Sequence, residues 1–291
     1  MTTIIETNYG NFQIERFNSD NNEIGYDVYT EPHKDEIYGQ YIGEFYPTIS
    51  WDDDMEDDEK EIFIYDLEEF IKENVEIIKN EIISASDDMA KNFYLHVVDN
   101  GRTLSEKDIN GKHVYLHPNI NAGGAGGFAR GMIESLNQKP KATHVLLMDD
   151  DVLVLPESIR RTYNLLRISK QEYRDSIISG AMLYYERPEY QHEDIGTIND
   201  GCNFRPLKKT LLQSTLSNNL ENERYYTQHK NSYAAWWYCC IPLTVVREKG
   251  LPLPVFIRCD DMEYGLRAKT HFITMNGICV WHMGFTTKYN T

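Results

Sequence analysis

The stretch His144-Val145-Leu146-Leu147-Met148-Asp149-Asp150-Asp151 is an apolar run that ends abruptly in three aspartates. A short apolar run followed by turn-forming residues is typical of a strand buried in a sheet. Pro156 then stands in the first turn of a predicted helix over residues 156–168, where its missing N–H is tolerated. The sequence therefore places a cluster of carboxylates at the carboxyl end of a buried strand.

Predicted strands and helices alternate on either side of this run. The helices are expected at residues 68–83, 123–136 and 156–168, and the strands at residues 61–65, 94–98, 113–116 and 278–281. Such alternation predicts an α/β fold with a mostly parallel central sheet and helices on both of its faces. We expect residues 1–58 to form a small β-rich region with an acidic linker, and residues 59–291 to form the main domain.

The overall composition excludes some classes of function. A hydrophobic fraction of 41% is that of a folded globular protein, and 29 basic against 46 acidic residues disfavour binding to a nucleic-acid backbone. The polar N-terminus does not read as a signal peptide, and no apolar run approaches the roughly 20 residues that span a bilayer. We expect a cytoplasmic protein with at most peripheral contact to the inner face of the membrane. Its cysteines lack zinc-type spacing and are expected to be reduced: Cys202, Cys239, Cys240, Cys259 and Cys279.

The aspartate triplet has two interpretations. Adjacent carboxylates repel one another, so the cluster is stable only in water or around a cation, and ligands of open α/β sheets bind at the carboxyl ends of strands. Alternation along the strand points Asp149 and Asp151 to one side and Asp150 elsewhere. Oxygen ligands of this kind suit Mg²⁺ or Mn²⁺ shared with a diphosphate. The alternative is an acidic turn that only stabilises the start of the next helix.

A glycine-rich loop precedes the second predicted helix, in Asn121-Ala122-Gly123-Gly124-Ala125-Gly126-Gly127. Glycines that open a helix leave backbone N–H groups able to face an anion. The loop is neither a P-loop nor an in-register dinucleotide fingerprint, because no Gly-Lys-Ser/Thr follows and position 129 is Ala. A tight packing turn between strand and helix explains the glycines equally well.

Three downstream features complete the candidate set. Asp260 and Asp261 precede a predicted helix, where one carboxylate could act as a general base, although such a pair is more often a helix cap. Trp236 and Trp237 could stack against a sugar, although paired tryptophans are usually core residues. His282 closes an apolar strand and could supply a nitrogen ligand to the same cation, or be structural.

In this order, the segments resemble the family 2 glycosyltransferases of GT-A fold, and more narrowly the bacterial galactofuranosyltransferases that use UDP-galactofuranose. The resemblance covers roughly residues 94–285. Five ordered motifs together are hard to obtain by chance. They are residues 118–130, Leu147-Met148-Asp149-Asp150-Asp151 with Pro156-Glu157-Ser158-Ile159, Ala235-Trp236-Trp237, residues 252–268, and Val280-Trp281-His282-Met283.

The resemblance implies a cofactor and partners. Asp149, Asp151 and His282 match positions that bind Mn²⁺ or Mg²⁺, and Asp150 matches a contact to the donor sugar. The implied partners are a UDP-sugar donor and a glycan or lipid-linked glycan acceptor. A UDP-pyranose or dTDP-rhamnose donor is the near alternative. A non-catalytic relative that serves as an assembly partner is an alternative of a different class.

The resemblance also implies an inverting transfer. Asp261 matches the catalytic base, and Asp260 beside it matches a contact to the acceptor or donor. The base would take a proton from the acceptor hydroxyl while that oxygen attacks the anomeric carbon from the face opposite UDP. Trp236 and Trp237 match an aromatic platform for acceptor and donor.

The nucleotide end of the implied site matches in part. Asn121, Gly123 and Gly124 match a donor-contacting segment, and Asp99 resembles the position that often reads uracil. The family's first strand normally ends in a Thr/Ser-x-Asn-Arg segment that contacts the nucleotide, whereas Ile64-Tyr65-Asp66-Leu67 stands here. We therefore expect that contact to be rebuilt or weakened.

Overall fold

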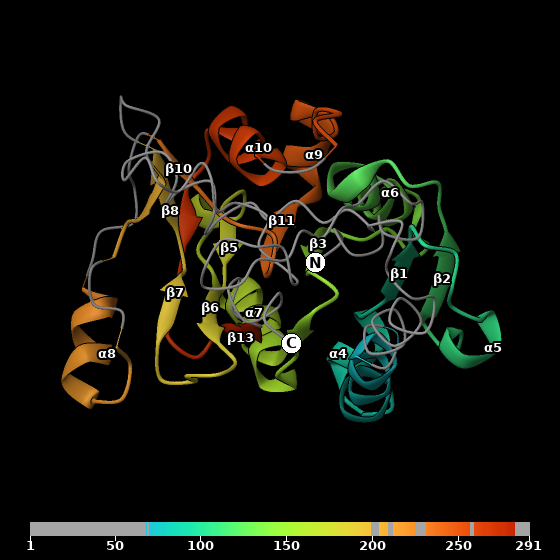
Figure 1. The fold of residues 1–291 in the computed structure, drawn as a ribbon, viewed down its shortest axis with the longest axis horizontal. Coiled ribbons are helices and arrows are strands. Elements are labelled where there is room, and N and C mark those ends of the chain that lie inside the picture. Colours follow the sequence, from blue (N-terminus) through green and yellow to red (C-terminus); the bar gives the residue numbers. More distant parts are fainter. Residues whose placement is uncertain are drawn as a thin grey trace, which may run out of the picture.

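The computed structural model describes residue 68 and residues 70–198, 204–208, 212–224, 231–256 and 259–282. The predicted β-rich region, the acidic linker and the predicted strand at residues 61–65 lie outside the described residues. The proposed division at residue 58 therefore stays a prediction. In the part that is described, strands and helices form the predicted α/β fold (Figure 1).

The central strands carry the candidate site at their ends. Two of them, β1 and β2, pair in parallel, and four others pair in the order β12-β5-β11-β3. Their bounds are β1 Leu95–Asp99, β2 Val114–Pro118, β3 His144–Leu147, β5 Ile177–Ser179, β11 Cys239–Pro242 and β12 Phe272–Ile273. The α/β class is thus confirmed, and the predicted strand before the aspartate triplet is present.

In the four-stranded sheet, β3, β5 and β12 run in one direction, so the predicted mostly parallel arrangement is confirmed, with β11 as its exception. Strand β11 runs antiparallel to both β3 and β5, while β5 and β12 are parallel. The physical reason is the route of the chain: β11 is entered from an antiparallel layer and not from a crossover helix, and antiparallel neighbours need no such helix. The alternation of strands and helices on which the prediction rested belongs to the first half of the chain.

Two smaller sheets complete the β-structure. One has the order β4-β13-β6-β7, in which β13 is antiparallel to β4 and parallel to β6. The other has the order β10-β8-β9 and is antiparallel throughout. Their bounds are β4 Val152–Leu153, β6 Ala181–Tyr184, β7 Gln191–Glu193, β8 Gly196–Ile198, β9 Phe204–Pro206, β10 Ser232–Tyr233 and β13 Cys279–His282.

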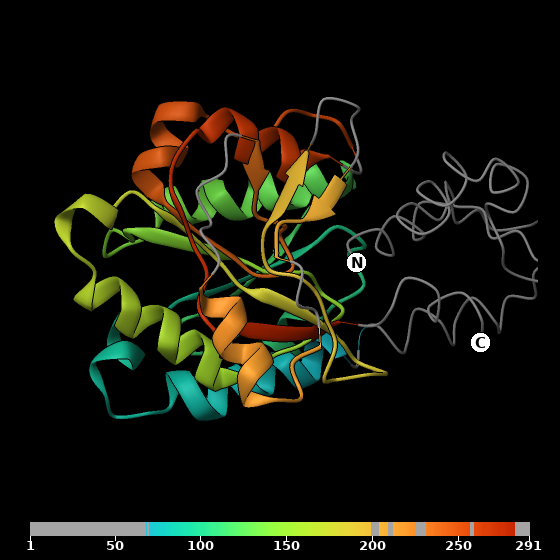
Figure 2. The same cartoon turned by 90° about the vertical axis from the view of Figure 1, so that its left-hand side faces the viewer.

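Helices cover both faces of the central strands, as predicted (Figure 2). Helices α6, α9 and α10 lie on one face, and α4, α7 and the helix of residues 70–78 lie on the other. That first helix continues as a π-helical turn, η2, at Lys79–Ile83. The others are α4 Asp88–Asn92, α5 Glu106–Ile109, α6 Gly123–Asn137, α7 Pro156–Ile168, α8 Leu216–Glu223, α9 Leu243–Lys249 and α10 Asp260–Ala268, with a 3₁₀ turn at Gln171–Tyr173.

Each face has its own apolar core. One cluster joins the first helix and α7 to the strands through Ile78, Ile82 and Ile159, and the other joins α6, α9 and α10 to the strands through Met132, Ile241 and others. Within the described residues, no helix is long and apolar enough to cross a bilayer. Within the described residues, Cys239, Cys240 and Cys279 are free thiols.

Candidate functional site

The aspartate triplet forms the turn between β3 and the short strand β4. Asp151 is buried, with a side chain 2% exposed, whereas Asp149 keeps 19% of its side chain exposed. Asn74 of the first helix fixes the chain just beyond the triplet. Its side-chain amide donates to the Val152 carbonyl (2.6 Å) and its oxygen accepts the Val154 N–H (3.1 Å). The backbone of this turn is therefore held from the helix side.

His282 reaches the triplet through strand pairing. It lies at the end of β13, and its register partner in the antiparallel strand β4 is Val152, which directly follows Asp151. The His282 Nε2 atom lies 3.1 Å from Asp151 Oδ1 and 3.9 Å from Asp149 Oδ2. The three residues that the motif pattern assigned to a cation are thus brought together.

The chemistry of this set fits the predicted ion. One ligand atom from each of Asp149, Asp151 and His282 can be chosen so that all three lie within 4.8 Å of one another. Two carboxylates and one neutral imidazole suit Mn²⁺ or Mg²⁺, which prefer oxygen ligands and share their remaining positions with water or phosphate oxygens. The partial exposure of Asp149 leaves a side of the set open to a ligand.

The two aspartates of α10 lie close enough to the triplet for their charges to interact. Burial raises the pKa of both Asp260 and Asp261, and their mutual repulsion raises the pKa of Asp261 further. Repulsion from Asp149 also raises the pKa of both carboxyls. Asp261 Oδ1 accepts the N–H of Met262 (2.6 Å). The downstream acidic pair and the triplet therefore belong to one site.

The paired tryptophans differ in their surroundings. Trp236 is 4% exposed and packs in the core, with its ring centroid 4.9 Å from Phe128 and 5.8 Å from Tyr264. Trp237 is half-buried, and its indole N–H donates to the Gly180 carbonyl (3.3 Å). Trp236 is thus a core residue, as paired tryptophans usually are. Its contact to a sugar stays a prediction, and Trp237 is the more accessible of the two.

The glycine-rich loop is packed against another segment. Gly123 N–H donates to the side chain of Asn121 (2.9 Å), and Ala125 N–H donates to the Phe256 carbonyl (3.2 Å). Gly123 and Gly124 are both buried. Two N–H groups at the start of α6 are therefore already used within the protein. Of the two interpretations of the loop, an anion site and a packing turn, this arrangement favours the packing turn. A contact of Asn121 with the donor stays a prediction.

Gly123 gives a prediction of its own. Its φ is +69°, and a Cβ atom would lie 2.0 Å from the Phe256 carbonyl oxygen, whereas Gly250 has φ +79° with nothing within 4 Å of a Cβ. Gly250→Ala should lower the melting temperature by about 2–12 °C, because its backbone conformation, with ψ −166°, is essentially restricted to glycine and costs another residue about 1–3 kcal/mol. Gly123→Ala should lower it further, since the collision adds to this strain. Thermal melts of both variants test it, and equal shifts would contradict the close contact.

Asp99 has a structural role that the sequence did not reveal. It is 3% exposed, and its two carboxylate oxygens accept the N–H groups of Arg102 (2.8 Å) and Leu104 (2.9 Å). It therefore organises the loop after β1. Asp99 also lines a cavity of about 150 Å³ together with Asp149 and Asp150, so it lies beside the triplet. The contact of Asp99 with the uracil of the donor stays a prediction.

Two further titratable groups near the site were not predicted. Strand β7 carries His192 and Glu193. Burial, followed by repulsion from His282, lowers the pKa of His192 to about 4. Burial and repulsion from Asp261 raise the pKa of Glu193. Residues 191–194 read as a polar surface segment, because nothing in the local pattern marks polar side chains that tertiary packing will bury.

The α/β fold and the carboxylate–imidazole set at a sheet edge define a candidate cation-dependent site. The chain is 33% identical over 191 residues to galactofuranosyltransferase GlfT2 of Mycolicibacterium smegmatis, and 33% identical over 191 residues to the protein of the same name from Mycobacterium tuberculosis. The matched part is 61% of this chain and 29% of each relative, so the chain spans less than a third of their length. No protein-family model matches the chain. The predicted resemblance to bacterial galactofuranosyltransferases is confirmed.

Proposed function

We propose that the chain is a metal-dependent, inverting glycosyltransferase that moves a sugar from a nucleotide-sugar donor to a hydroxyl of a glycan or lipid-linked glycan. The observation that carries this proposal is the convergence of two separate motifs on one site. Asp149, Asp151 and His282 come together within 4.8 Å, and the acidic pair of α10 lies within electrostatic reach of Asp149. The relatives' names point to the same class of reaction.

The residues divide into two groups by their task. Asp149, Asp151 and His282 would hold Mn²⁺ or Mg²⁺, which when bound supplies positive charge to a diphosphate leaving group. Asp261 would accept the proton of the acceptor hydroxyl, because burial and like charges raise its pKa and so make it a stronger base than a free aspartate. In this proposal Asp150 and Asp260 contact the sugars, and Trp237 borders them.

UDP-galactofuranose is the donor that the proposal favours, since both relatives are named galactofuranosyltransferases. The experiment is a donor screen in which the purified chain, Mn²⁺ and a galactofuranose-containing acceptor are incubated with single donors. Mass spectrometry of the acceptor should show a gain of one or more hexose units with UDP-galactofuranose. A gain with UDP-galactopyranose or dTDP-rhamnose alone would replace the donor and keep the class of reaction.

A non-catalytic role is the competing function, and titration calorimetry separates it. An active transferase should bind UDP more tightly when Mn²⁺ is present. A folded protein that binds no UDP at millimolar concentration, with or without Mn²⁺, would favour an assembly partner and would overturn the proposal.

A further inference from the structure

Trp237 is half-buried and is held at the edge of its indole ring. The indole N–H donates to the Gly180 carbonyl (3.3 Å), and the Gly180 N–H donates to the Tyr238 carbonyl (2.9 Å). A Cβ atom on Gly180 would lie 2.4 Å from the Tyr238 ring, so glycine is needed for this close approach. A single hydrogen bond at the ring edge lets the indole rotate about that bond, so the plane of the ring depends on a second contact.

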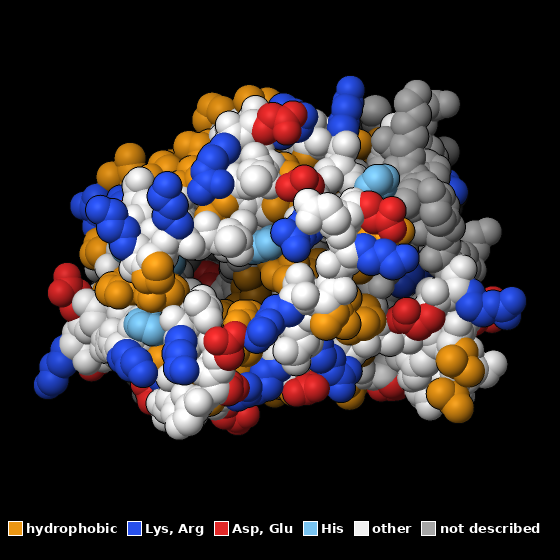
Figure 3. Space-filling model, turned by 180° about the vertical axis from the view of Figure 1, so that it is seen from behind, with side chains coloured by type: hydrophobic (Ala, Val, Ile, Leu, Met, Phe, Trp, Pro, Cys, Tyr) orange, Lys and Arg blue, Asp and Glu red, His pale blue; other side chains and the backbone are white. Residues whose placement is uncertain are grey.

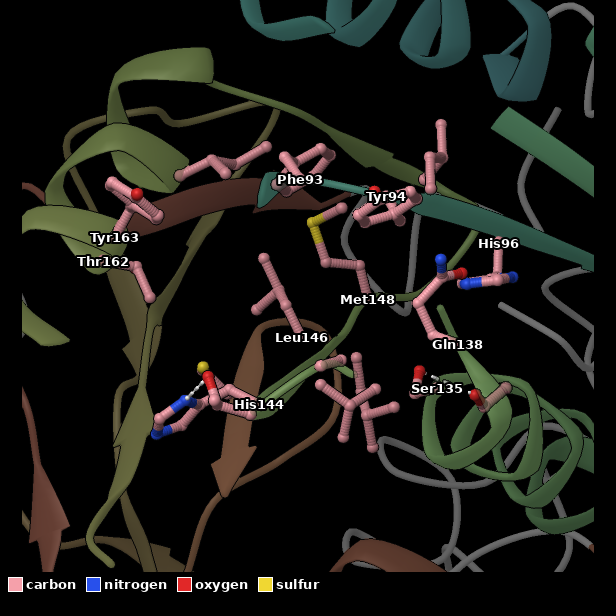
Figure 4. Close-up of a pocket in the computed structure, with 18 of the residues that line it drawn as sticks. Phe93, Tyr94, His96, Ser135, Gln138, His144, Leu146, Met148, Thr162 and Tyr163 are labelled. Carbon is pink, nitrogen blue, oxygen red and sulfur yellow. Dashed lines mark hydrogen bonds between the residues drawn. The ribbon is translucent and has the colours of Figure 1, made fainter. Parts of the chain in front are cut away.

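The large cavity of the molecule does not supply this contact. Figure 4 shows the cavity, which has a volume of about 660 Å³, with Phe93 and Tyr94 on one side and His144 and Leu146 on the other. Seen from behind, the molecule is hollowed, and hydrophobic side chains border the hollow (Figure 3). Trp237 is not among the described residues that line the cavity. Its ring contacts strand β7 instead.

His192 of β7 is the extra residue of a β-bulge. Its neighbours Gln191 and Glu193 pair with adjacent residues of β6, which leaves no register partner in β6 for His192. Bulges are frequent next to active sites, where they re-aim a side chain. The His192 and Trp237 rings are nearly perpendicular, with centroids 5.8 Å apart and planes at 81°. The break in the strand pairing thus brings His192 against the more accessible of the two tryptophans.

Tyr184 fixes the orientation of the His192 ring. Its hydroxyl oxygen lies 2.7 Å from His192 Nδ1, and the two ring centroids are 5.5 Å apart. The Arg187 guanidinium lies over the Tyr184 ring, 5.6 Å from its centroid. In the parallel pair of β6 and β13, Tyr184 is the register partner of His282. The group of Tyr184, His192 and Trp237 therefore stands beside the candidate cation site.

We propose that His192 is a positioning residue that sets the plane of Trp237 beside the candidate cation site. This role rests on the proposed function, in which Trp237 borders the sugars. The Gly180 carbonyl holds the indole N–H, His192 contacts the indole ring, and Tyr184 orients His192. A ring that is fixed before a sugar arrives binds it without the entropy cost of being ordered. We therefore expect His192 to strengthen the binding of the acceptor without touching it.

His192→Ala should raise the acceptor KM by about 3-fold to 10-fold, the factor that a contact between aromatic rings contributes. The kcat and the Mn²⁺-dependent affinity for UDP should stay within about 2-fold, because a change in binding alone raises KM without lowering kcat. Initial rates with a galactofuranose-containing acceptor measure KM and kcat, and calorimetric titration measures the affinity for UDP. An unchanged KM in a folded His192→Ala would overturn the inference.

The matched control is Gln191→Ala. Gln191 is the buried neighbour of His192 in β7, and its side-chain oxygen accepts from Asn222 of α8 (3.4 Å). Its loss disturbs the same strand without removing a contact of Trp237. The acceptor KM of this variant should therefore stay within about 2-fold of that of the unchanged chain. An equal rise of KM in both variants would show a general effect of β7 and would contradict the inference.

A double-mutant cycle tests whether His192 acts through Trp237. In a Trp237→Ala background, His192→Ala should raise the acceptor KM by less than about 2-fold, because the ring that it positions is absent. The same rise in both backgrounds would give His192 a role of its own, and the proposed positioning would then be wrong.

Near-ultraviolet circular dichroism reports the fixed surroundings of aromatic rings and needs no turnover. The difference between the spectra of the unchanged chain and Trp237→Phe isolates Trp237 from the other tryptophans. This difference should shrink in a His192→Ala background and persist in a Gln191→Ala background. A difference of unchanged size in folded His192→Ala would contradict the inference. If the unchanged chain transfers no sugar, the proposed function fails, and this spectrum alone decides whether His192 holds Trp237.

Tyr184→Phe takes the place of His192→Ala if that variant does not fold. It removes only the hydroxyl that lies 2.7 Å from His192 Nδ1. The acceptor KM should then rise by about 2-fold to 10-fold, the factor that one hydrogen bond contributes, and this rise should disappear in a Trp237→Ala background. A KM that Tyr184→Phe leaves unchanged would remove the support for His192 as a positioning residue.

Discussion

Asp261→Asn should reduce turnover by about 100-fold to 10,000-fold while leaving UDP affinity nearly unchanged. An asparagine has the size of aspartate and cannot take a proton, so the substitution removes general-base catalysis, which contributes a factor of this order. Asp261 is separate from Asp149, Asp151 and His282, so the residues proposed to hold the cation stay intact. Initial rates of sugar transfer and calorimetric titration with UDP measure the two quantities.

Glu263→Gln is the matched control for this variant. Glu263 lies on the same helix, α10, and forms an ion pair with Arg267 one turn further along. Its substitution should leave turnover within a few-fold of that of the unchanged chain.

The pH profile adds a test that a merely structural role would not meet. Burial and like charges raise the pKa of Asp261, so the rate should rise with pH above the range of a free aspartate, and Asp261→Asn should lose this limb. Turnover that persists in Asp261→Asn would show that another group is the base.

Asp151→Asn should abolish the strengthening of UDP binding by Mn²⁺. The Asp151 side chain is 2% exposed and lies 3.1 Å from His282 Nε2, so its carboxylate is more enclosed than that of Asp149. Outer contacts of a metal ligand are worth about 10-fold to 100-fold in affinity, so the loss of a ligand should weaken cation-dependent UDP binding by at least about 100-fold. Titration with UDP, with and without Mn²⁺, measures the effect.

Glu157→Gln serves as the control, because Glu157 is an acid of the next helix with a side chain 52% exposed. It should titrate like the unchanged chain. Circular dichroism and a thermal melt establish that Asp151→Asn is folded before the titration is interpreted. Cation-dependent UDP binding of unchanged strength in a folded Asp151→Asn would remove Asp151 from the proposed ligands.

Local patterns predicted the elements whose signals lie within a few residues. The apolar run before Asp149 became β3, and Pro156 begins α7, which ends at Ile168 as expected. Periodic apolar side chains predicted the helix near residues 68–83, most of which is described as helical. The direction of β11 could not be predicted, because it depends on where the chain returns from a distant layer.

The candidate site likewise has features that local sequence patterns predicted and features that depend on distant parts of the chain. Residue types and motif order predicted that Asp149, Asp151 and His282 lie together, because each has a side chain that can bind a metal and stands at the end of a predicted strand. In the structure the three lie together. The hydrogen-bond partners of Asp99 and the burial of Trp236 depend on side chains far away in sequence. An aspartate can therefore be a candidate metal ligand, as Asp151 is, or hold a loop by hydrogen bonds, as Asp99 does, and only the folded structure distinguishes the two.

The pairing of β4 with β13 has a consequence for stability. Asp151 and His282 stand 131 positions apart in sequence (282 − 151), yet their side chains lie 3.1 Å from each other. An ion shared by them would bind the folded chain in preference to the unfolded one, in which the two side chains are rarely close together. A cation at 100 times its dissociation constant would stabilise the folded chain by about 2.7 kcal/mol. Resistance to unfolding in this protein would then follow the concentration of free cation.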